Sequence, residues 1–315
     1  MQRLAHFLSE LPVFLYLSSF PKFEERNVSV QCYTDDTQLY VSFYPDAESE
    51  TLEKLEQCIE NLRGWMNRNR LKLNDSKTEF IIFGTKSKLR SVKTTSVRVG
   101  EEHITAVKNV RNIGAYFDCE LKMDTQVNNM CKRAWLHLYN IGKIRSYLTL
   151  DQAKTLVHAY VTSKLDANNS LLAGITVEHK RQLERVQNAA AKVVTKRKKF
   201  DSVTPLLYDL HWLPIKDRIK FKILLLTYKS LNEKGPVYLK ELFMIKSSPH
   251  QTRLSNALTL DYPLTKLASY GDRAFSIAAA KKWNKLPQTI RASTSVNSFK
   301  NQLKTYLFKE RFACV

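Results

Sequence analysis

Hydrophobic and polar residues alternate on both sides of an acidic tetrapeptide in the first fifth of the chain. The tetrapeptide is Tyr33-Thr34-Asp35-Asp36, and the apolar positions that flank it are Val28, Val30, Cys32, Leu39, Val41 and Phe43. A period of two is typical of β-strands that bury one face. The pattern therefore predicts an antiparallel hairpin at about 28–43, with the adjacent carboxylates of Asp35 and Asp36 at its turn.

Longer segments repeat their apolar residues at helical spacing. After Pro45 one such segment predicts a helix around 52–66, whose apolar face ends at Trp65. Two short strands are expected next, at 80–83 before Gly84 and at 110–118. The expected order is thus hairpin, helix, strand, strand.

The remainder of the chain is expected to be mostly helical. Helices are predicted at 130–144, 150–161, 178–194, 219–231 and 295–308, and a short strand at 254–260. The segment 219–231 is almost continuously apolar, so we expect it to be buried. Gly235-Pro236 is the expected boundary of the last region.

The charge of the chain is concentrated in this helical part. The 315 residues carry 50 Lys and Arg against 30 Asp and Glu, a net charge of +20. Residues 1–120 hold 16 basic and 17 acidic side chains, whereas residues 121–315 hold 34 and 13, a net of +21. Such an excess favours contact with a polyanion such as nucleic acid. The alternative is a helical surface whose solvated faces are rich in lysine.

The densest basic run is Lys196-Arg197-Lys198-Lys199, which follows the helix predicted at 178–194. Three interpretations of this run have comparable weight. It contacts nucleic-acid phosphates, it is a nuclear-import signal, or it is a solvated helix end.

The acidic turn has two interpretations. Hard cations such as Mg²⁺ prefer oxygen ligands, and two metal ions can hold the attacking and leaving oxygens of a phosphoryl transfer. Asp35 and Asp36 on a rigid hairpin suit that chemistry. Aspartate is also a favoured turn residue, which accounts for the same pattern without any function.

Several classes of protein are disfavoured. The five cysteines, at positions 32, 58, 119, 131 and 314, are widely spaced and form no Cys-x-x-Cys pair, which argues for a reducing compartment and against a zinc site. No Gly-rich phosphate loop stands out, and the apolar run 11–17 is too short to cross a bilayer. We expect a nuclear or cytoplasmic protein that is not secreted, with no membrane association and no obligate protein partner.

The ordered motifs together resemble the reverse transcriptases of non-LTR (LINE-type) retrotransposons. Residues 33–40 resemble the Tyr-x-Asp-Asp catalytic hairpin of that family, residues 65–79 resemble the next palm motif, and residues 110–118 resemble the strand that leads into the primer grip. The resemblance continues through Leu210-His211-Trp212-Leu213-Pro214, Tyr270-Gly271-Asp272-Arg273-Ala274-Phe275 and Trp283-Asn284-Lys285-Leu286-Pro287. It covers roughly residues 13–312, in the family's order.

The resemblance implies an α+β fold in three regions. These are a partial palm with the catalytic hairpin (1–120), a basic helical thumb (121–235) and a C-terminal extension without assigned role (236–315). It also implies RNA-directed DNA synthesis with Mg²⁺, an RNA template, a DNA primer and deoxynucleotides. Asp35 would bind the metal ions, and Asp36 would support the site or bind more weakly. Tyr33 would pack near the primer terminus, and Lys77 would protonate the leaving pyrophosphate. Lys196–Lys199 would contact the template–primer duplex.

One departure from the family pattern limits these expectations. The family carries another metal-binding Asp on an earlier strand, then a Gly-rich segment, and this sequence starts only about thirty residues before the hairpin. Residues 11–20 resemble the helix that follows the Gly-rich segment. Because a two-metal site needs carboxylates from separate strands, the hairpin supplies half a site. We therefore expect a sheet with an open edge and no catalysis by these residues alone. The alternative function is a non-catalytic remnant or domesticated element that binds nucleic acid or protein.

Overall fold

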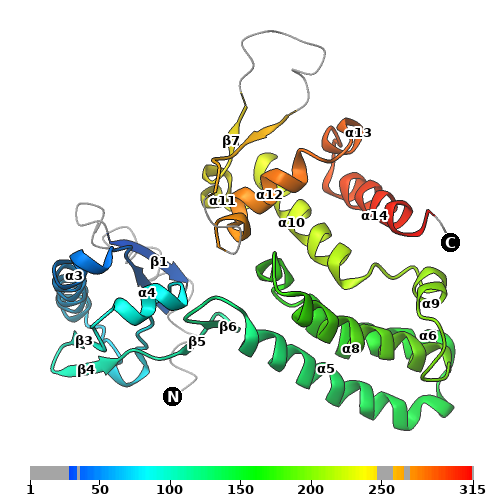
Figure 1. Cartoon of the computed structure of the whole chain (residues 1–315), viewed down its shortest axis with the longest axis horizontal. Helices are drawn as coiled ribbons and strands as arrows, with labels where there is room; N and C mark the ends of the chain where they lie inside the picture. The colour runs from blue at the N-terminus through cyan, green and yellow to red at the C-terminus, as the bar shows by residue number, and fades with distance from the viewer. Residues whose placement is uncertain (1–27, 34–35, 247–257, 266–269, 314–315) are drawn as a thin grey trace. The chain divides into compact units, whose positions relative to one another are not determined.

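The chain divides into two compact units, residues 1–121 and 122–315. Most of the described strands lie in the first unit and most of the helices in the second (Figure 1). The computed structural model describes residues 28–33, 36–246, 258–265 and 270–313. Within these residues the chain mixes helices with short antiparallel strand pairs, so its fold class is α+β as expected. The helix expected at 11–20 lies outside the described residues.

Unit 1 is built from one long helix and three described β-hairpins. Its elements are β1 (Ser29–Tyr33), β2 (Asp36–Tyr40), η2 (Pro45–Ala47), α3 (Glu48–Arg68), η3 (Asp75–Lys77), α4 (Lys86–Ser91), β3 (Ser96–Val99), β4 (Glu102–Thr105), β5 (Asn109–Asn112) and β6 (Ala115–Asp118). In the described part of the chain β1 and β2 pair only with each other.

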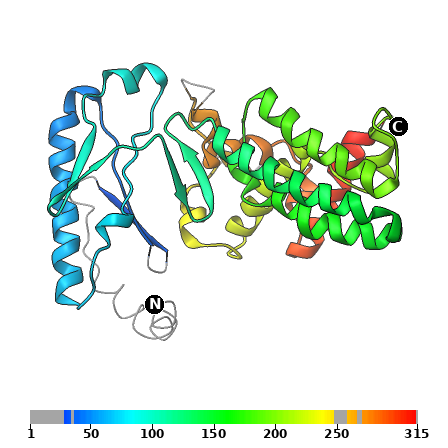
Figure 2. The same cartoon turned by 90° about the horizontal axis from the view of Figure 1, so that it is seen from below.

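The core of unit 1 lies between α3 and the strands, which Figure 2 shows beside the long helix. Leu55, Ile59 and Leu62 recur at the spacing of one helical face and are buried. They meet Val97 and Val99, which alternate with the exposed Arg98 on β3. This helix confirms the periodicity of the sequence, and it extends beyond the predicted 52–66 at both ends.

Two expected strands of unit 1 are corrected by the structure. Residues 80–83 form no strand, because only Phe80 pairs, through a single parallel bridge to Ala106. The expected strand 110–118 is a hairpin of two strands, β5 and β6. Ile113 and Gly114 between them both have positive φ, of 43° and 79°. Positive φ at both central residues is the geometry of a tight two-residue hairpin turn.

The described residues of unit 2 are helical apart from one short strand pair. Its elements are α5 (Asp124–Ile144), η4 (Arg145–Tyr147), α6 (Leu150–Val157), the π-helical η5 (His158–Thr162), α7 (Ser163–Asp166), η6 (Asn169–Leu172), α8 (Val177–Thr195), α9 (Thr204–Asp209), α10 (Ile215–Leu231), α11 (Val237–Glu241), β7 (Met244–Ile245), β8 (Leu260–Asp261), η7 (Gly271–Arg273), α12 (Phe275–Trp283), α13 (Gln288–Arg291) and α14 (Val296–Phe312). The five predicted helices are therefore confirmed, although the one at 150–161 changes to π geometry after Val157. The strand predicted at 254–260 lies partly outside the described residues, and β8 begins at its last position.

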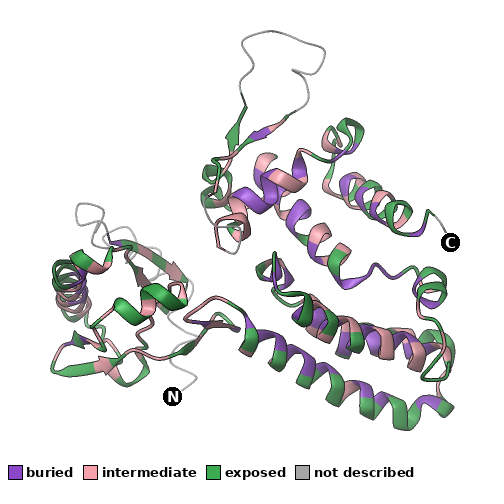
Figure 3. Ribbon diagram, viewed as in Figure 1, coloured by how far each residue is buried: buried purple, intermediate pink, exposed green. Residues whose placement is uncertain are grey.

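One hydrophobic core of unit 2 joins α10 to α12 and α14. Leu224 and Tyr228 of α10 pack with Trp283 of α12 and with Phe299 of α14, and the rings of Tyr228 and Phe299 are stacked at 4.1 Å. Figure 3 shows α10 and α12 as largely buried, which matches the apolar character of 219–231. Residues on both sides of the boundary expected at 235–236 thus contribute to one core.

Candidate functional site

The β1–β2 hairpin carries the acidic motif. Strand pairing sets Tyr33 opposite Asp36, followed outward by Cys32 with Thr37 and Val30 with Leu39. The predicted antiparallel hairpin is therefore confirmed, and Asp36 begins its second strand directly after the turn. Thr34 and Asp35, which connect the two strands, lie outside the described residues.

The two faces of this hairpin have different roles. Val30 and Leu39 pack against the core of unit 1. Because side chains of a strand alternate between faces, Tyr33 and Asp36 belong to the opposite face. Both are exposed, Tyr33 to 59%. The Asp36 carboxylate is thus accessible to a cation or to a polar ligand.

The hairpin is linked to β5 through a polar contact on its outer face. The Gln38 side-chain amide donates a hydrogen bond to Oδ1 of Asn112, at 2.8 Å. Gln38 pairs with Gln31 on the same face as Asp36. This bond therefore joins the strand that begins with Asp36 to the β5–β6 hairpin. That hairpin occupies the segment 110–118, for which a single strand was predicted.

Lys77 lies on a different element from the hairpin. It is exposed at the end of η3, a segment held against α3 by the 2.7 Å ion pair between Arg63 and Asp75. In the described part of the chain, Lys77 and Asp36 form no hydrogen bond or ion pair with each other. The structure therefore brings Tyr33 and Asp36 together and leaves Lys77 on a separate segment.

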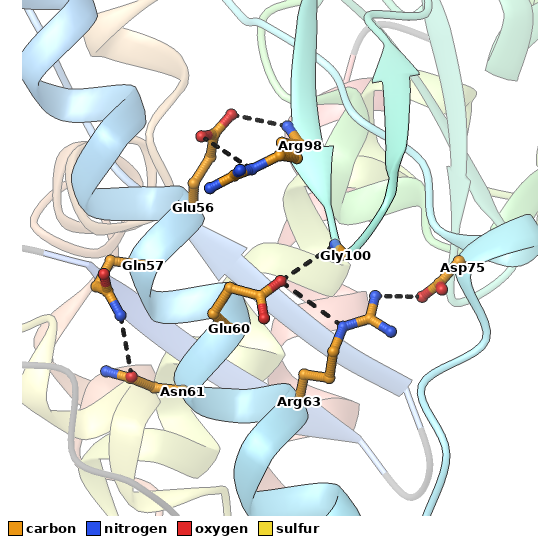
Figure 4. A network of polar contacts seen from close by, with 8 residues as sticks. All are labelled: Glu56, Gln57, Glu60, Asn61, Arg63, Asp75, Arg98 and Gly100. Carbon is orange, nitrogen blue, oxygen red and sulfur yellow. Dashed lines mark hydrogen bonds and ion pairs between the residues drawn. The ribbon is translucent and has the colours of Figure 1, made fainter.

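Helix α3 holds the β3–β4 hairpin through carboxylates that accept hydrogen bonds from backbone N–H groups (Figure 4). Glu56 accepts from Arg98 N at 2.8 Å, and Glu60 accepts from Gly100 N at 3.2 Å. Gly100 has a φ of +64°, and a Cβ there would lie 2.6 Å from the Arg63 guanidinium. Glycine is therefore required at this turn both by its backbone angle and by the Arg63 side chain.

Glu48, at the start of α3, makes a third contact of this kind. Its carboxylate accepts hydrogen bonds from the backbone N–H of Thr94 and of Lys93, the latter at 3.1 Å. The bonds from Thr94, with those from Lys93, hold the pKa of the Glu48 carboxyl below its usual value. Sequence reasoning missed this network, because its partners lie about 40 to 46 residues apart along the chain.

The oxygen donor of the hairpin is of the type that Mg²⁺ prefers, but the described donors are too few for a metal site. Asp36 is the only described member of the predicted metal pair, since Asp35 is not placed. In the described parts of the chain, no three His, Cys, Asp or Glu side chains gather in a group that could hold a metal ion. The chemistry of Asp36 thus fits one ligand of a Mg²⁺ site and no more.

The predicted basic run lies at the end of α8 and borders an open groove with a volume of about 440 Å³. We call this the basic groove, and it is lined by Gly142, Arg145, Ala189, Lys192, Val193, Lys196, Arg197 and Lys199. Lys196 ends α8 in the left-handed conformation, with a φ of 54°. Lys196–Lys199 are all exposed, so the structure brings the predicted basic residues together at one surface.

Arg145 forms the floor of the basic groove and has a structural role. Its guanidinium donates hydrogen bonds to the carbonyls of Val193, Val194 and Leu148, at 2.9, 2.6 and 2.7 Å. Two of these carbonyls belong to the last turn of α8, and that of Val193 also accepts from the Lys196 N–H at 3.3 Å. The Lys192 ammonium donates to the Lys199 carbonyl, which holds the basic run against the helix. The run therefore has a defined conformation.

No protein-family model, curated protein sequence or solved structure matches this chain at a significant level. None of the described helices has the length and apolar character needed to cross a bilayer.

Proposed function

We propose that this chain is part of an RNA-directed DNA polymerase of the non-LTR retrotransposon type. The observation that carries the proposal is the β1–β2 hairpin, which pairs Tyr33 with Asp36 and leaves both exposed beside its turn. The colinear motifs of the sequence support it, because a Tyr-x-Asp-Asp hairpin followed by a helix and further strands is the order of that family's palm.

In this proposal each chain segment has a defined task. Asp35 and Asp36 supply carboxylate oxygens to Mg²⁺, which would stabilise the charge of a nucleotidyl transfer. Tyr33, beside Asp36 on the exposed face, packs near the primer terminus. Lys77 protonates the leaving pyrophosphate if η3 approaches the bound nucleotide. Unit 1 thus corresponds to the palm and unit 2 to the thumb.

Primer extension tests the catalytic part of the proposal. The 315-residue polypeptide with Mg²⁺, deoxynucleotides and an RNA template should not extend a DNA primer, because one strand's carboxylates hold the two ions weakly. Joined to an upstream palm segment that carries a further Asp strand, the same residues should support synthesis that Asp35→Asn abolishes. Synthesis that survives Asp35→Asn in the joined protein would refute the assignment of the hairpin.

A second function, nucleic-acid binding without catalysis, is favoured by the basic groove. Three of the cationic residues that line it are exposed, namely Lys196, Arg197 and Lys199. Unit 2 carries the whole excess of positive charge in the chain, whereas unit 1 is close to neutral. Lysine and arginine side chains bind phosphates without reading sequence, and this term dominates non-specific affinity.

Gly142 offers a clean test of this second function. A Cβ at Gly142 would meet no atom within 4 Å, so a larger side chain is accommodated in the basic groove. Gly142→Glu should weaken binding of a labelled oligonucleotide several-fold at low salt, because it places a negative charge beside the cations. Gly142→Gln is the matched control and should bind like the parent chain. Equal affinities of the two variants at low salt would exclude the groove as the binding site.

A further inference from the structure

Three exposed aromatic residues lie next to groove-lining residues along the chain. Tyr139 is one turn before Gly142 on α5, Tyr147 ends η4 two residues after Arg145, and Phe200 follows Lys199. Their exposed fractions are 62%, 86% and 92%. Rings of this size normally bury most of their surface, so their exposure around a cationic groove is the unexplained feature of unit 2.

The arrangement of α5 and α8 explains why the rings and the cations meet. The two helices run in parallel, because Asp124 at the start of α5 contacts His179 at the start of α8, at 2.9 Å, while Arg145 meets the last turn of α8. Figure 1 shows the two helices side by side. The two helices therefore end on the same side of unit 2, and η4 and the basic run both begin there.

Cations at helix C-termini have a simple structural explanation, which accounts for only part of this surface. The carbonyls at a helix end attract positive charge, and Arg145 meets that need through its three hydrogen bonds. The side chains of Lys196, Arg197 and Lys198 make no ion pair among the described residues. Neither helix capping nor packing of unit 2 explains these three cations or the rings.

Two of the three rings already lie close to an ammonium group. Lys199 Nζ is 5.7 Å from the Phe200 ring centre, and Lys143 Nζ is 4.5 Å from the Tyr139 ring centre. Aromatic faces beside cations are the arrangement by which proteins bind single-stranded nucleic acid, with bases stacked on rings and phosphates on the cations. A duplex keeps its base faces stacked inside and leaves such rings unused.

We infer that the basic groove binds single-stranded RNA or DNA, with unpaired bases stacked on Phe200 and Tyr147 and phosphates on Lys196–Lys199. This inference rests on the proposed nucleic-acid binding and names its substrate class. Stacking does not depend on base identity, so the groove has little sequence preference. The positive charge at its rim selects this occupant over an apolar helix of a protein partner.

The test compares oligonucleotides that differ only in their bases. The full chain is titrated, with fluorescence anisotropy as readout, against a labelled 12-nucleotide RNA, the same sequence as DNA, an abasic 12-mer and a 12-base-pair duplex. Phe200→Ala and Tyr147→Ala should each weaken binding of the RNA or DNA single strand by about tenfold. The abasic strand and the duplex should lose nothing, and Phe200→Trp should restore affinity.

Tyr238→Ala is the matched control, since Tyr238 is an exposed ring on α11 and no residue near it in the sequence lines the basic groove. If Phe200→Ala and Tyr147→Ala leave single-strand affinity unchanged while Gly142→Glu lowers it, the stacking inference is wrong and the proposed binding stands. If no oligonucleotide binds at low salt, both are wrong. Concentration-dependent self-association of the free chain that Phe200→Ala abolishes would assign the rings to a second copy instead.

Discussion

At the scale of single residues, polar side chains of unit 1 hold the chain together by accepting backbone hydrogen bonds. Glu48 is 7% exposed and accepts bonds from two consecutive N–H groups, of Lys93 and Thr94. Glu50, two positions later, is exposed and pairs only with Lys54 of the same helix, at 2.6 Å. Loss of the Glu48 carboxylate would thus leave two backbone N–H groups without an acceptor, whereas loss of the Glu50 carboxylate would leave only the exposed ammonium of Lys54.

This difference predicts a pH-dependent effect of Glu48→Gln. The pKa of Glu48 is lowered in the folded state, so its contribution to stability is present above the unfolded pKa near 4.5 and is lost as the pH falls through the folded value. At pH 7 the substitution should lower the free energy of unfolding of unit 1 by about 1–3 kcal/mol. The deficit should shrink as the pH falls below 4.5 and through the lowered pKa of the folded state, because the parent carboxyl then becomes protonated too.

Urea denaturation at pH 7 and in acid, followed by circular dichroism, measures both effects. Glu50→Gln is the control, and it should change stability little at either pH, because an exposed i,i+4 pair contributes little. A deficit of Glu48→Gln that is as large in acid as at pH 7 would show that the substitution acts through packing rather than through charge.

At the scale of elements, the end of α8 depends on a residue from another helix end. Arg145 is 8% exposed and binds carbonyls of Val193 and Val194, about 48 residues away in sequence. Hydrogen bonds from a charged donor to buried acceptors contribute more than neutral ones. The conformation of the basic run therefore depends on Arg145 as well as on its own sequence.

Arg145→Met should lower the free energy of unfolding of unit 2 by about 2–3 kcal/mol, because the carbonyls of Val193, Val194 and Leu148 lose the charged donor that binds them. Arg145→Lys should fall between Met and the parent, since one ammonium cannot reproduce the planar fork of the guanidinium. Lys143→Met removes a neighbouring exposed cation and should have little effect. Denaturant titrations of the three variants measure the order, and similar losses for Lys143→Met and Arg145→Met would contradict it.

The elements that the sequence predicted are those with a strong local period. The hairpin at 28–43 and helices such as α3 and α14 bury one face, and that face is visible as alternation or helical spacing. The β5–β6 hairpin was missed because Ile113, at its turn, has a positive φ that isoleucine rarely adopts. Only the adjacent Gly114 marked the turn.

The candidate site was predictable in part for the same reason. The position of Asp36 at the turn of a hairpin followed from alternation, and the basic run was visible as four consecutive cations. The cap by Arg145 and the rings beside the groove depend on the parallel approach of α5 and α8. Contacts between helix ends so far apart in sequence leave no local period to detect.

At the scale of the whole molecule, charge and core are divided along the same line. Unit 1 has its own core around α3 and unit 2 has its own around α10. The net charge is −1 in residues 1–121 and +21 in residues 122–315. Each unit therefore has the apolar core that independent folding requires, and only unit 2 carries a charge that attracts a polyanion.

We expect nucleic-acid binding to reside in residues 122–315. As a separate polypeptide that retains its helical circular dichroism, this unit should bind a labelled single strand within about twofold of the full chain, and residues 1–121 should not bind. Affinity should fall steeply with salt, because each phosphate contact releases a counterion. Replacing Lys196, Arg197, Lys198 and Lys199 by alanine should reduce the magnitude of the log–log salt slope by about 3.

Substitution of four exposed lysines elsewhere in unit 2 controls for total charge. Lys216, Lys222, Lys234 and Lys246 are exposed and do not line the basic groove, so their replacement by alanine should change the slope far less. If both sets reduced the slope equally, binding would follow the net charge of unit 2, and the groove would have no special part in it. A slope changed only by the 196–199 set would locate the phosphates at the end of α8, where the floor of the groove and its exposed rings already define a site.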